Sequence, residues 1–452
     1  MKKSRLISAL LATLPLSAAA SLAHAAQIHL DAELGQSVLP AKSNGSIYLR
    51  LSLKALTSTK QERRTPLNVA IVIDRSGSMS GDRIVAAREA ANVALERLSA
   101  DDTVSLVAFN HKVDVLHPAA RLGSAHESLR KAIAELRPDG TTALYAGVKE
   151  GGQQVREFLS DTKVNRVVLV SDGLANVGPS SPDDLAGLGR ELGAKGISVT
   201  TLGLGLDYNE DLMQRLASAS DGNHAFIESP RQLADIFDKE FGDALSVSAR
   251  DIHIRIEFKD GFKPKRVLSR EADINGNSIT MKMTHLQSGN ERYVVIEAEA
   301  PRGAGVGEAQ VASVDVDYLD LDTGSKARAE ATVKATISAD DGDVERSLNK
   351  SVMSQVTEQV ATENTRASVE LRDKGDIEGA RKVLNDNASY LNRSKGALSS
   401  GAAAAPSASI QRLDELEKKS KEAANSLDDQ DWNRTRKAMR HDQSRYGAQQ
   451  KF

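Results

Sequence analysis

The sequence of 452 residues predicts an α/β fold: a doubly wound, mostly parallel sheet inserted in a β-sandwich, followed by a C-terminal α-helical region. Three patterns lead to this prediction. Residues 69–73 are an unbroken apolar run, typical of a central strand buried on both faces of a parallel sheet. Strand and helix patterns alternate over residues 66–245, and strands that alternate apolar with polar residues flank that segment. Residues 340–452 are charged and have helical periodicity.

The first 25 residues have the pattern of a secretory signal peptide. Lys2 and Lys3 precede the apolar residues 6–22, and residues 23–25 read A-H-A, the A-x-A form of a cleavage site. Cleavage there removes three basic residues and no acidic one, and takes the formal net charge from −3 to −6. We therefore predict a mature chain in a bacterial periplasm, or secreted beyond it. An uncleaved membrane anchor is the alternative, and no later segment is long and apolar enough to span a membrane.

The composition excludes several kinds of site. The chain has no cysteine, which removes disulfides, thiolate metal ligands and cysteine catalysis. Its mildly acidic charge and its 4% aromatic content give no basic footprint and few stacking platforms for nucleic acid. We predict no nucleic-acid partner.

Alternating apolar residues predict six strands outside the central segment. These are residues 28–34 and 47–53 before it, and residues 252–258, 279–283, 294–298 and 314–318 after it. Two strands cannot bury a face alone, so we predict that residues 26–57 and 247–336 form one discontinuous β-sandwich. Two separate β pieces are the alternative.

The central segment, residues 66–245, alternates strands with helices. Further strands are predicted at residues 104–109, 113–117, 167–171, 199–206 and 224–226. Helices are predicted at residues 87–98, 129–136, 143–159, 183–192, 210–217 and 231–244. The short pair of strands around residues 110–111 predicts a hairpin, which gives the sheet one antiparallel edge.

Oxygen-bearing side chains follow the central strand. Asp74, Ser76 and Ser78 supply one carboxylate and two hydroxyls at alternate positions. Ligands of an open α/β sheet bind beyond the carboxyl ends of its strands, and converging oxygens suit a hard cation such as Mg²⁺. These residues alone also fit a capped helix start. The metal interpretation gains from Thr142 and Asp172, which stand at a loop mouth and at a strand end.

These motifs resemble the von Willebrand factor type A domains that carry a metal-ion-dependent adhesion site. That family has a D-x-S-x-S loop after the first strand, then a threonine before the third helix and an aspartate after the fourth strand. The matches are DRSGS at residues 74–78, Thr142 in DGTTALYAGV and Asp172 in VVLVSDG. We choose Thr142 over its neighbour Thr141 because it keeps the family's spacing to Gly147. The resemblance covers about residues 66–241.

The resemblance implies both a metal site and a function. The implied metal ligands are Asp74, Ser76, Ser78, Thr142 and Asp172. The implied cofactor is Mg²⁺, or Mn²⁺ or Ca²⁺, and the implied partner is a protein whose Asp or Glu completes the metal shell. The function is then that of a non-enzymatic adhesion or scaffold module of the cell envelope. The alternative is a hydrolase that uses the same ion as a Lewis acid.

Two further expectations come from the resemblance. Arg75 stands where many relatives carry a small or apolar residue, and we expect it to influence which anionic partner is admitted. The last helix of the domain moves with the metal site in relatives, which makes Leu233, Ile236 and Phe237 candidates for a switch face. A plain core helix is the alternative for these three residues.

Other catalytic and cofactor motifs are missing from the sequence. It contains no G-x-x-x-x-G-K-[ST] loop, and residues 203–205 lack the third glycine of a dinucleotide site. The nine histidines show no helical metal-pair spacing, and the serines of the DRSGS loop have no nucleophile-elbow context. We assign no catalytic and no cofactor-binding residues.

The region 340–452 predicts two helical hairpins. Helices are expected at residues 344–371, 377–391, 410–427 and 432–446, with a flexible stretch at residues 396–409. The second helices of the pairs share a D-[IW]-x-x-x-R-K pattern that weakly resembles tetratricopeptide-like modules. An interaction arm and a solvated tail are both open. If the repeat is real, Trp432 packs near Leu413, Leu416 or Leu427.

Overall fold

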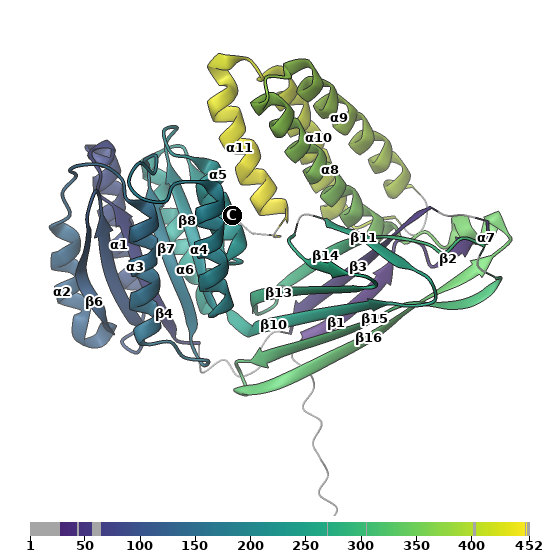
Figure 1. The fold of residues 1–452 in the computed structure, drawn as a ribbon, viewed down its shortest axis with the longest axis horizontal. Coiled ribbons are helices and arrows are strands. Elements are labelled where there is room, and N and C mark those ends of the chain that lie inside the picture. The colour runs from purple at the N-terminus through teal and green to yellow at the C-terminus, as the bar shows by residue number, and fades with distance from the viewer. Residues whose placement is uncertain are drawn as a thin grey trace, which may run out of the picture.

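A computed structural model describes residues 28–42, 45–56, 65–268, 270–303, 305–400, 404–447 and 449, without the side chains of residues 243–245. The predicted signal peptide, residues 1–25, lies outside the described residues. An α/β domain forms one end of the molecule and a β-sandwich the other, and a group of helices spans the two (Figure 1). This arrangement has the predicted fold class.

The sheet of the α/β domain is built around β4 (Leu67–Asp74), in which every residue is buried. The strand order is β6-β5-β4-β7-β8-β9. The other strands are β5 (Thr103–Phe109), β6 (Val113–Arg121), β7 (Val164–Ser171), β8 (Ile197–Leu204) and β9 (His224–Ile227). Neighbouring strands are parallel except β5 and β6, which confirms the predicted antiparallel edge. The carboxyl ends of β4, β7 and β8 therefore meet at one edge of the sheet.

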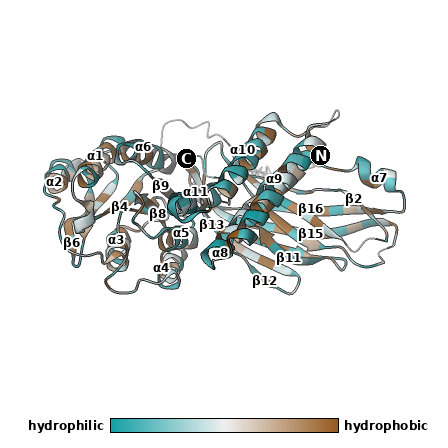
Figure 2. Ribbon diagram, turned by 90° about the horizontal axis from the view of Figure 1, so that it is seen from above, coloured by the Kyte–Doolittle hydropathy of each residue, from teal (hydrophilic) through white to brown (hydrophobic). Residues whose placement is uncertain are grey.

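Helices cover both faces of this sheet (Figure 2). On one face lie α1 (Asp82–Arg97), α2 (Leu122–Ala134) and α6 (Leu233–Leu245), and on the other α3 (Leu144–Glu157), α4 (Pro182–Ala194) and α5 (Glu210–Ala219). The short helical turns η1 (Gly77–Met79) and η2 (Pro230–Gln232) precede α1 and α6. The prediction placed the start of α1 at residue 87, so the structure adds a turn at its N-terminus.

The candidate switch residues of α6 are core residues in this structure. Leu233 and Phe237 are fully buried, and Ile236 packs against the same apolar cluster. The rings of Phe237 and Phe241 stack with their centroids 5.9 Å apart. The packing is that of the plain core helix that we kept as the alternative.

The β-sandwich consists of two sheets with a shared apolar core. The first has the order β1-β3-β14-β11, with β1 (Ile28–Leu34), β3 (Ser46–Ala55), β14 (Glu291–Glu299) and β11 (Lys263–Leu268). The second has the order β12-β13-β10-β15-β16-β2, with β12 (Asp273–Asn275), β13 (Ser278–Gln287), β10 (Val247–Phe258), β15 (Gly307–Asp320), β16 (Ser325–Ser338) and β2 (Val38–Pro40). Strand β3, which precedes the α/β domain, pairs antiparallel with β14, which follows it. The α/β domain is thus inserted between strands of one sandwich.

In the described part of the chain, five helices follow the sandwich. They are α7 (Asp341–Arg346), α8 (Lys350–Asp373), α9 (Ile377–Ser399), α10 (Ser407–Asn425) and α11 (Asp429–Gly447). The prediction of a flexible stretch at residues 396–409 was wrong at both ends, because α9 continues to Ser399 and α10 begins at Ser407. Leu398 and Ala405 are buried between the helices, and this packing outweighs the low helix propensity of the glycine and serine residues. None of the helices in the described part of the chain has the length and apolar content needed to cross a bilayer.

Packing joins the helical region to both other parts. Trp432 and Leu427 lie in one apolar cluster with Val369 and Leu384, so the two hairpins share a core. On the sandwich side, the Tyr293 hydroxyl donates to Glu358 of α8 at 2.7 Å. On the other side, α11 lies along α5 and β9 of the α/β domain (Figures 1 and 2). The tail is therefore docked along its length and is not a solvated appendage.

Candidate metal site

The five predicted metal ligands lie on three loops at the carboxyl edge of the sheet. Asp74 is the last residue of β4, and Ser76 and Ser78 follow it around η1. Asp172 directly follows β7, and Thr142 precedes α3. All are buried except Ser78, whose exposure opens the group to solvent.

Hydrogen bonds connect four of these residues. The Ser76 amide donates to Asp74 Oδ1 at 2.7 Å, and the hydroxyls of Ser76 and Ser78 are 2.9 Å apart. The Ser78 hydroxyl donates to Asp172 Oδ1 at 2.8 Å. The oxygens of the loop after β4 and of the loop after β7 therefore converge, as the sequence spacing predicts.

The Thr142 hydroxyl lies close to Asp74, and both border the space above Gly173. A Cβ atom placed on Gly173 would lie 2.9 Å from Thr142 Oγ1 and 3.3 Å from Asp74 Oδ2. Both oxygens thus border the space above this glycine, which only a residue without a side chain leaves open. Thr141 is exposed, whereas Thr142 is buried, so the geometry agrees with the chosen register.

Backbone hydrogen bonds connect the loop after β4 to the loop before α3. Gly77 N donates to Gly140 O at 2.9 Å, and Asp139 N donates to Arg75 O at 2.8 Å. The Ala143 amide, next to Thr142, donates to Asn110 O at 2.7 Å. Because these contacts use main-chain atoms, the oxygen-bearing side chains are positioned before any ligand arrives.

The five candidate ligands include two carboxyl groups and no basic side chain. Burial raises the pKa of Asp74 to about 6, hydrogen bonds from Ser171 and Ser76 oppose this shift, and the neighbouring Asp172 adds to it. Two carboxylates and three hydroxyls that face one another suit a small hard cation with oxygen ligands. No group of three or more His, Cys, Asp or Glu side chains suited to a metal ion occurs among the described residues, so this site depends on its hydroxyls.

One cation at the site was not predicted. Arg83, the second residue of α1, donates to Asp172 Oδ2 and to Asp207 Oδ2, the latter at 2.8 Å. The predicted helix began at residue 87, so residue 83 lay outside it. A basic residue one helical turn beyond the DRSGS loop was the available signal.

Arg75 makes its polar contacts within the α/β domain. Its guanidinium forms an ion pair with Asp114 of β6, and its amide donates to Phe109 O at 2.7 Å. The side chain is engaged within the α/β domain, where its charge is neutralised. The expectation that Arg75 selects an anionic partner gains no support from this geometry.

The α/β domain matches a known sequence family. A sequence model of the von Willebrand factor type A domain matches residues 68–239. The chain contains a von Willebrand factor type A (VWA) domain. The match covers the α/β domain from β4 to α6, with all five candidate ligands inside it.

Curated relatives are similar to less than half of this chain. An uncharacterized protein of Synechocystis is 31% identical over 211 residues, which cover 46% of this chain and 49% of that protein. The human inter-alpha-trypsin inhibitor heavy chain H4 is 30% identical over 184 residues, or 38% of this chain and 20% of that protein. The chain thus spans half or less of the length of these relatives.

Solved structures share the fold over a larger part of the chain. A von Willebrand factor type A protein from Catenulispora acidiphila has a TM-score of 0.68 at 17% identity, covering 86% of this chain and 96% of that one. The ArnB paralog VWA2 from Sulfolobus acidocaldarius has a TM-score of 0.62 at 16% identity, covering 94% of this chain and all of that one. The shared fold therefore extends beyond the VWA domain.

Proposed function

We propose that the protein is a divalent-metal-dependent protein-binding module of the bacterial cell envelope, acting as an adhesin or scaffold. A carboxylate of the partner protein would complete the metal shell. The observation that supports this most is the convergence of five oxygen-bearing side chains from three loops. One of the five, Ser78, is exposed to solvent.

The proposed ligands are of two kinds. Asp74 and Asp172 supply negative charge, while Ser76, Ser78 and Thr142 supply neutral oxygens. A bound Mg²⁺, Mn²⁺ or Ca²⁺ would contribute the positive charge that attracts an acidic side chain. Because three of the five ligands are uncharged, the protein leaves much of that charge for the partner. The exposed Ser78 marks the side from which the partner approaches.

The envelope location is proposed from the N-terminal pattern. Residues 1–25 combine a basic start, an apolar stretch and an A-x-A cleavage site. Mass spectrometry of the protein recovered from a periplasmic or culture-medium fraction tests this. A mature N-terminus at Ala26 is the expected result, and an intact Met1 in the cytoplasm would contradict the location.

The binding function is tested with two serine variants of the same loop. Ser78→Ala removes a proposed ligand, whereas Ser80→Ala removes an exposed hydroxyl that donates to Gly77 O at 2.8 Å. We expect Mn²⁺ binding in calorimetry, and Mg²⁺-dependent capture of a protein from an envelope extract, for the wild type and Ser80→Ala but not for Ser78→Ala.

Two outcomes would contradict the proposed function. One is capture that persists equally in a chelator and in Ser78→Ala, because binding would then not depend on the metal. The other is metal-dependent hydrolysis of a general esterase or phosphatase substrate that Ser78→Ala abolishes, because the ion would then act as a Lewis acid in an enzyme.

A further inference from the structure

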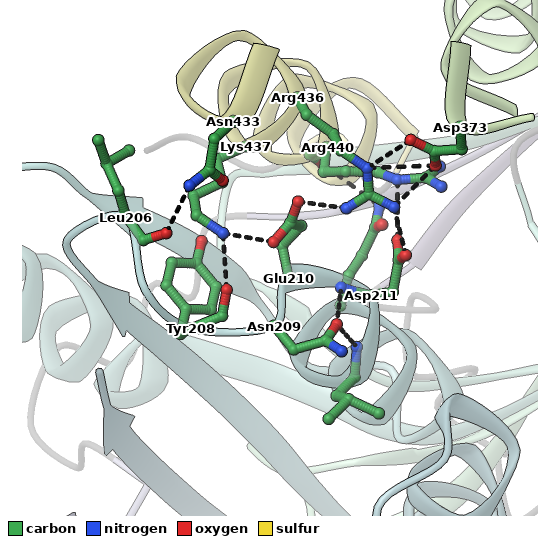
Figure 3. A network of polar contacts seen from close by, with 12 residues as sticks. Leu206, Tyr208, Asn209, Glu210, Asp211, Asp373, Asn433, Arg436, Lys437 and Arg440 are labelled. Carbon is green, nitrogen blue, oxygen red and sulfur yellow. Dashed lines mark hydrogen bonds and ion pairs between the residues drawn. The ribbon is translucent and has the colours of Figure 1, made fainter. Parts of the chain in front are cut away.

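The C-terminal helix α11 holds the loop that follows β8 (Figure 3). Because β8 is parallel to β7, this loop lies at the same edge of the sheet as the metal site. Asn433 Nδ2 donates to Leu206 O at 2.9 Å, and Lys437 Nζ donates to Tyr208 O at 2.6 Å. These two carbonyls flank Asp207. The position of Asp207 is therefore fixed on both sides by the tail.

Ion pairs strengthen this contact at the start of α5. Glu210 pairs with both Lys437 and Arg436, and Asp211 pairs with Arg436 and with Arg440, the latter at 3.0 Å. Figure 3 shows these side chains converging from α11 and α5. Lys437 is 1% exposed and Glu210 is 4% exposed. Removal of one partner of a buried pair leaves the other charge uncompensated, so this contact is sensitive to single substitutions.

Asp207 connects the loop held by α11 to the metal site. Its Oδ2 accepts from Arg83 Nη2 at 2.8 Å, and the same guanidinium donates to Asp172. A Cβ atom on Gly205 would lie 3.1 Å from Arg83 Nη2, so the guanidinium also packs against the loop backbone. A continuous set of contacts thus runs from Asp172 through Arg83 and Asp207 to α11.

We propose that docking of α11 and ion binding at the metal site oppose each other. With α11 docked, Asp207 holds Arg83 on Asp172, where its positive charge occupies a carboxylate that the ion needs. Release of α11 frees the loop and weakens the hold on Arg83. This proposal deepens the function proposed above and rests on its metal site, for which it supplies a regulatory contact within the chain.

The coupling works in both directions. Two cations that share one carboxylate repel each other, so an ion bound at Asp172 displaces Arg83. The displaced Arg83 loses its fixed place against Asp207, and the loop that α11 holds loses one of its contacts. By thermodynamic linkage, the factor by which α11 docking weakens ion binding is the factor by which the ion weakens docking.

Mn²⁺ titration of the full chain by calorimetry tests the proposal. We compare the wild type with Asp207→Asn, which cuts the connection, and with Lys437→Gln, which weakens docking. The matched control is Arg434→Gln: Arg434 also lies on α11, but its ion pair with Glu228 at 2.8 Å is solvent-exposed on both sides and contributes little to docking. We expect the first two variants to bind Mn²⁺ about five- to tenfold more tightly than the wild type, a coupling of ordinary size. The control keeps the affinity of the wild type.

Hydrogen exchange supplies the reverse measurement. Saturating Mn²⁺ should speed amide exchange in α11 of the wild type, and should leave it unchanged in Asp207→Asn. The side chain of Asp207 is 66% exposed, so this variant keeps the fold even if Lys437→Gln does not.

The outcomes separate this proposal from the function on which it rests. Mn²⁺ affinity that is unchanged or weaker in Asp207→Asn would overturn the coupling and leave the metal site in place. A wild type that binds no Mn²⁺ would overturn the coupling and the proposed function together.

Discussion

Thr142 and Asn176 exchange two hydrogen bonds. The Thr142 amide donates to Asn176 Oδ1 at 2.8 Å, and the Asn176 amide donates to Thr142 O at 3.1 Å. The Val177 amide also donates to Thr142 O, at 3.2 Å. The loop after β7 therefore fixes the backbone of a candidate ligand that belongs to another loop.

Asn176→Ala should weaken Mn²⁺ binding about tenfold, a typical loss when a group that orients a metal ligand is removed. The variant keeps all five ligands, so calorimetry measures the effect of position alone. Asn176→Asp retains the acceptor oxygen and should bind more tightly than Asn176→Ala. Equal affinity of Asn176→Ala and the wild type would show that Thr142 needs no such support.

Gly173→Ala should reduce Mn²⁺ binding sharply, because its methyl group would lie 2.9 Å from Thr142 Oγ1 and displace this hydroxyl. Gly187→Ala is the matched control, since a Cβ atom there meets nothing within 4 Å. It lies within α4, where alanine is favoured over glycine by about 1 kcal/mol, and it should raise stability without changing Mn²⁺ affinity. Undiminished binding by Gly173→Ala would place the ion away from Thr142.

Asp74→Asn should stabilise the metal-free protein at pH 7 while abolishing Mn²⁺ binding. The folded-state pKa of Asp74, about 6, lies above its ordinary 3.8 because of burial, so the free energy of unfolding falls as pH rises from about 4 to 6. The amide avoids this loss, worth up to ~3 kcal/mol, although it weakens the bonds from Ser171 and Ser76. Thermal melts at pH 7 and pH 4 test this, because the gain should be largest at pH 7. A lower melting temperature at pH 7 would instead make Asp74 a structural residue of its loop.

Stability should fall as the pH drops from 7.5 to 5, in part because of His224. Burial first, and then the charge of His441, lower the pKa of His224 to about 3. The unfolded chain takes up this proton near pH 6.5 and the folded chain does not, so stability present above pH 6.5 is lost below it, about 2 kcal/mol at pH 5. His224→Gln should flatten the pH dependence of the melting temperature, and the exposed His29→Gln should not. A steep pH dependence that survives His224→Gln would assign it to other groups.

The sequence was sufficient for the features that depend on local patterns. The apolar run of β4 predicted a central strand, and it placed Asp74 at the edge where Asp172 also lies. The alternation around residues 110–111 predicted the antiparallel edge. In each case the sequence pattern lies within about ten residues, because the burial of a strand and the type of a turn depend mainly on neighbouring residues.

The contacts that surround the site could not be predicted in this way. Arg83 contacts Asp172 and Asp207, which lie 89 and 124 residues further along the chain. Lys437 contacts Glu210, 227 residues away. Charged residues on helices are usually solvated, so nothing in their local sequence indicates which of them become buried partners. The extension of α9 to Ser399 was missed for the same reason, since it depends on tertiary burial of Leu398.

We propose that one divalent ion is held by Asp74, Ser76, Ser78, Thr142 and Asp172. This assignment can be tested by anomalous diffraction from crystals of the protein grown or soaked with Mn²⁺, because the anomalous signal locates the ion without reference to the ligands. We predict a strong peak among these side chains, with Arg83 moved away from Asp172. A metal-soaked crystal without a peak at this site, or with Arg83 still on Asp172 and the ion bound elsewhere, would show that these five residues do not form the metal site.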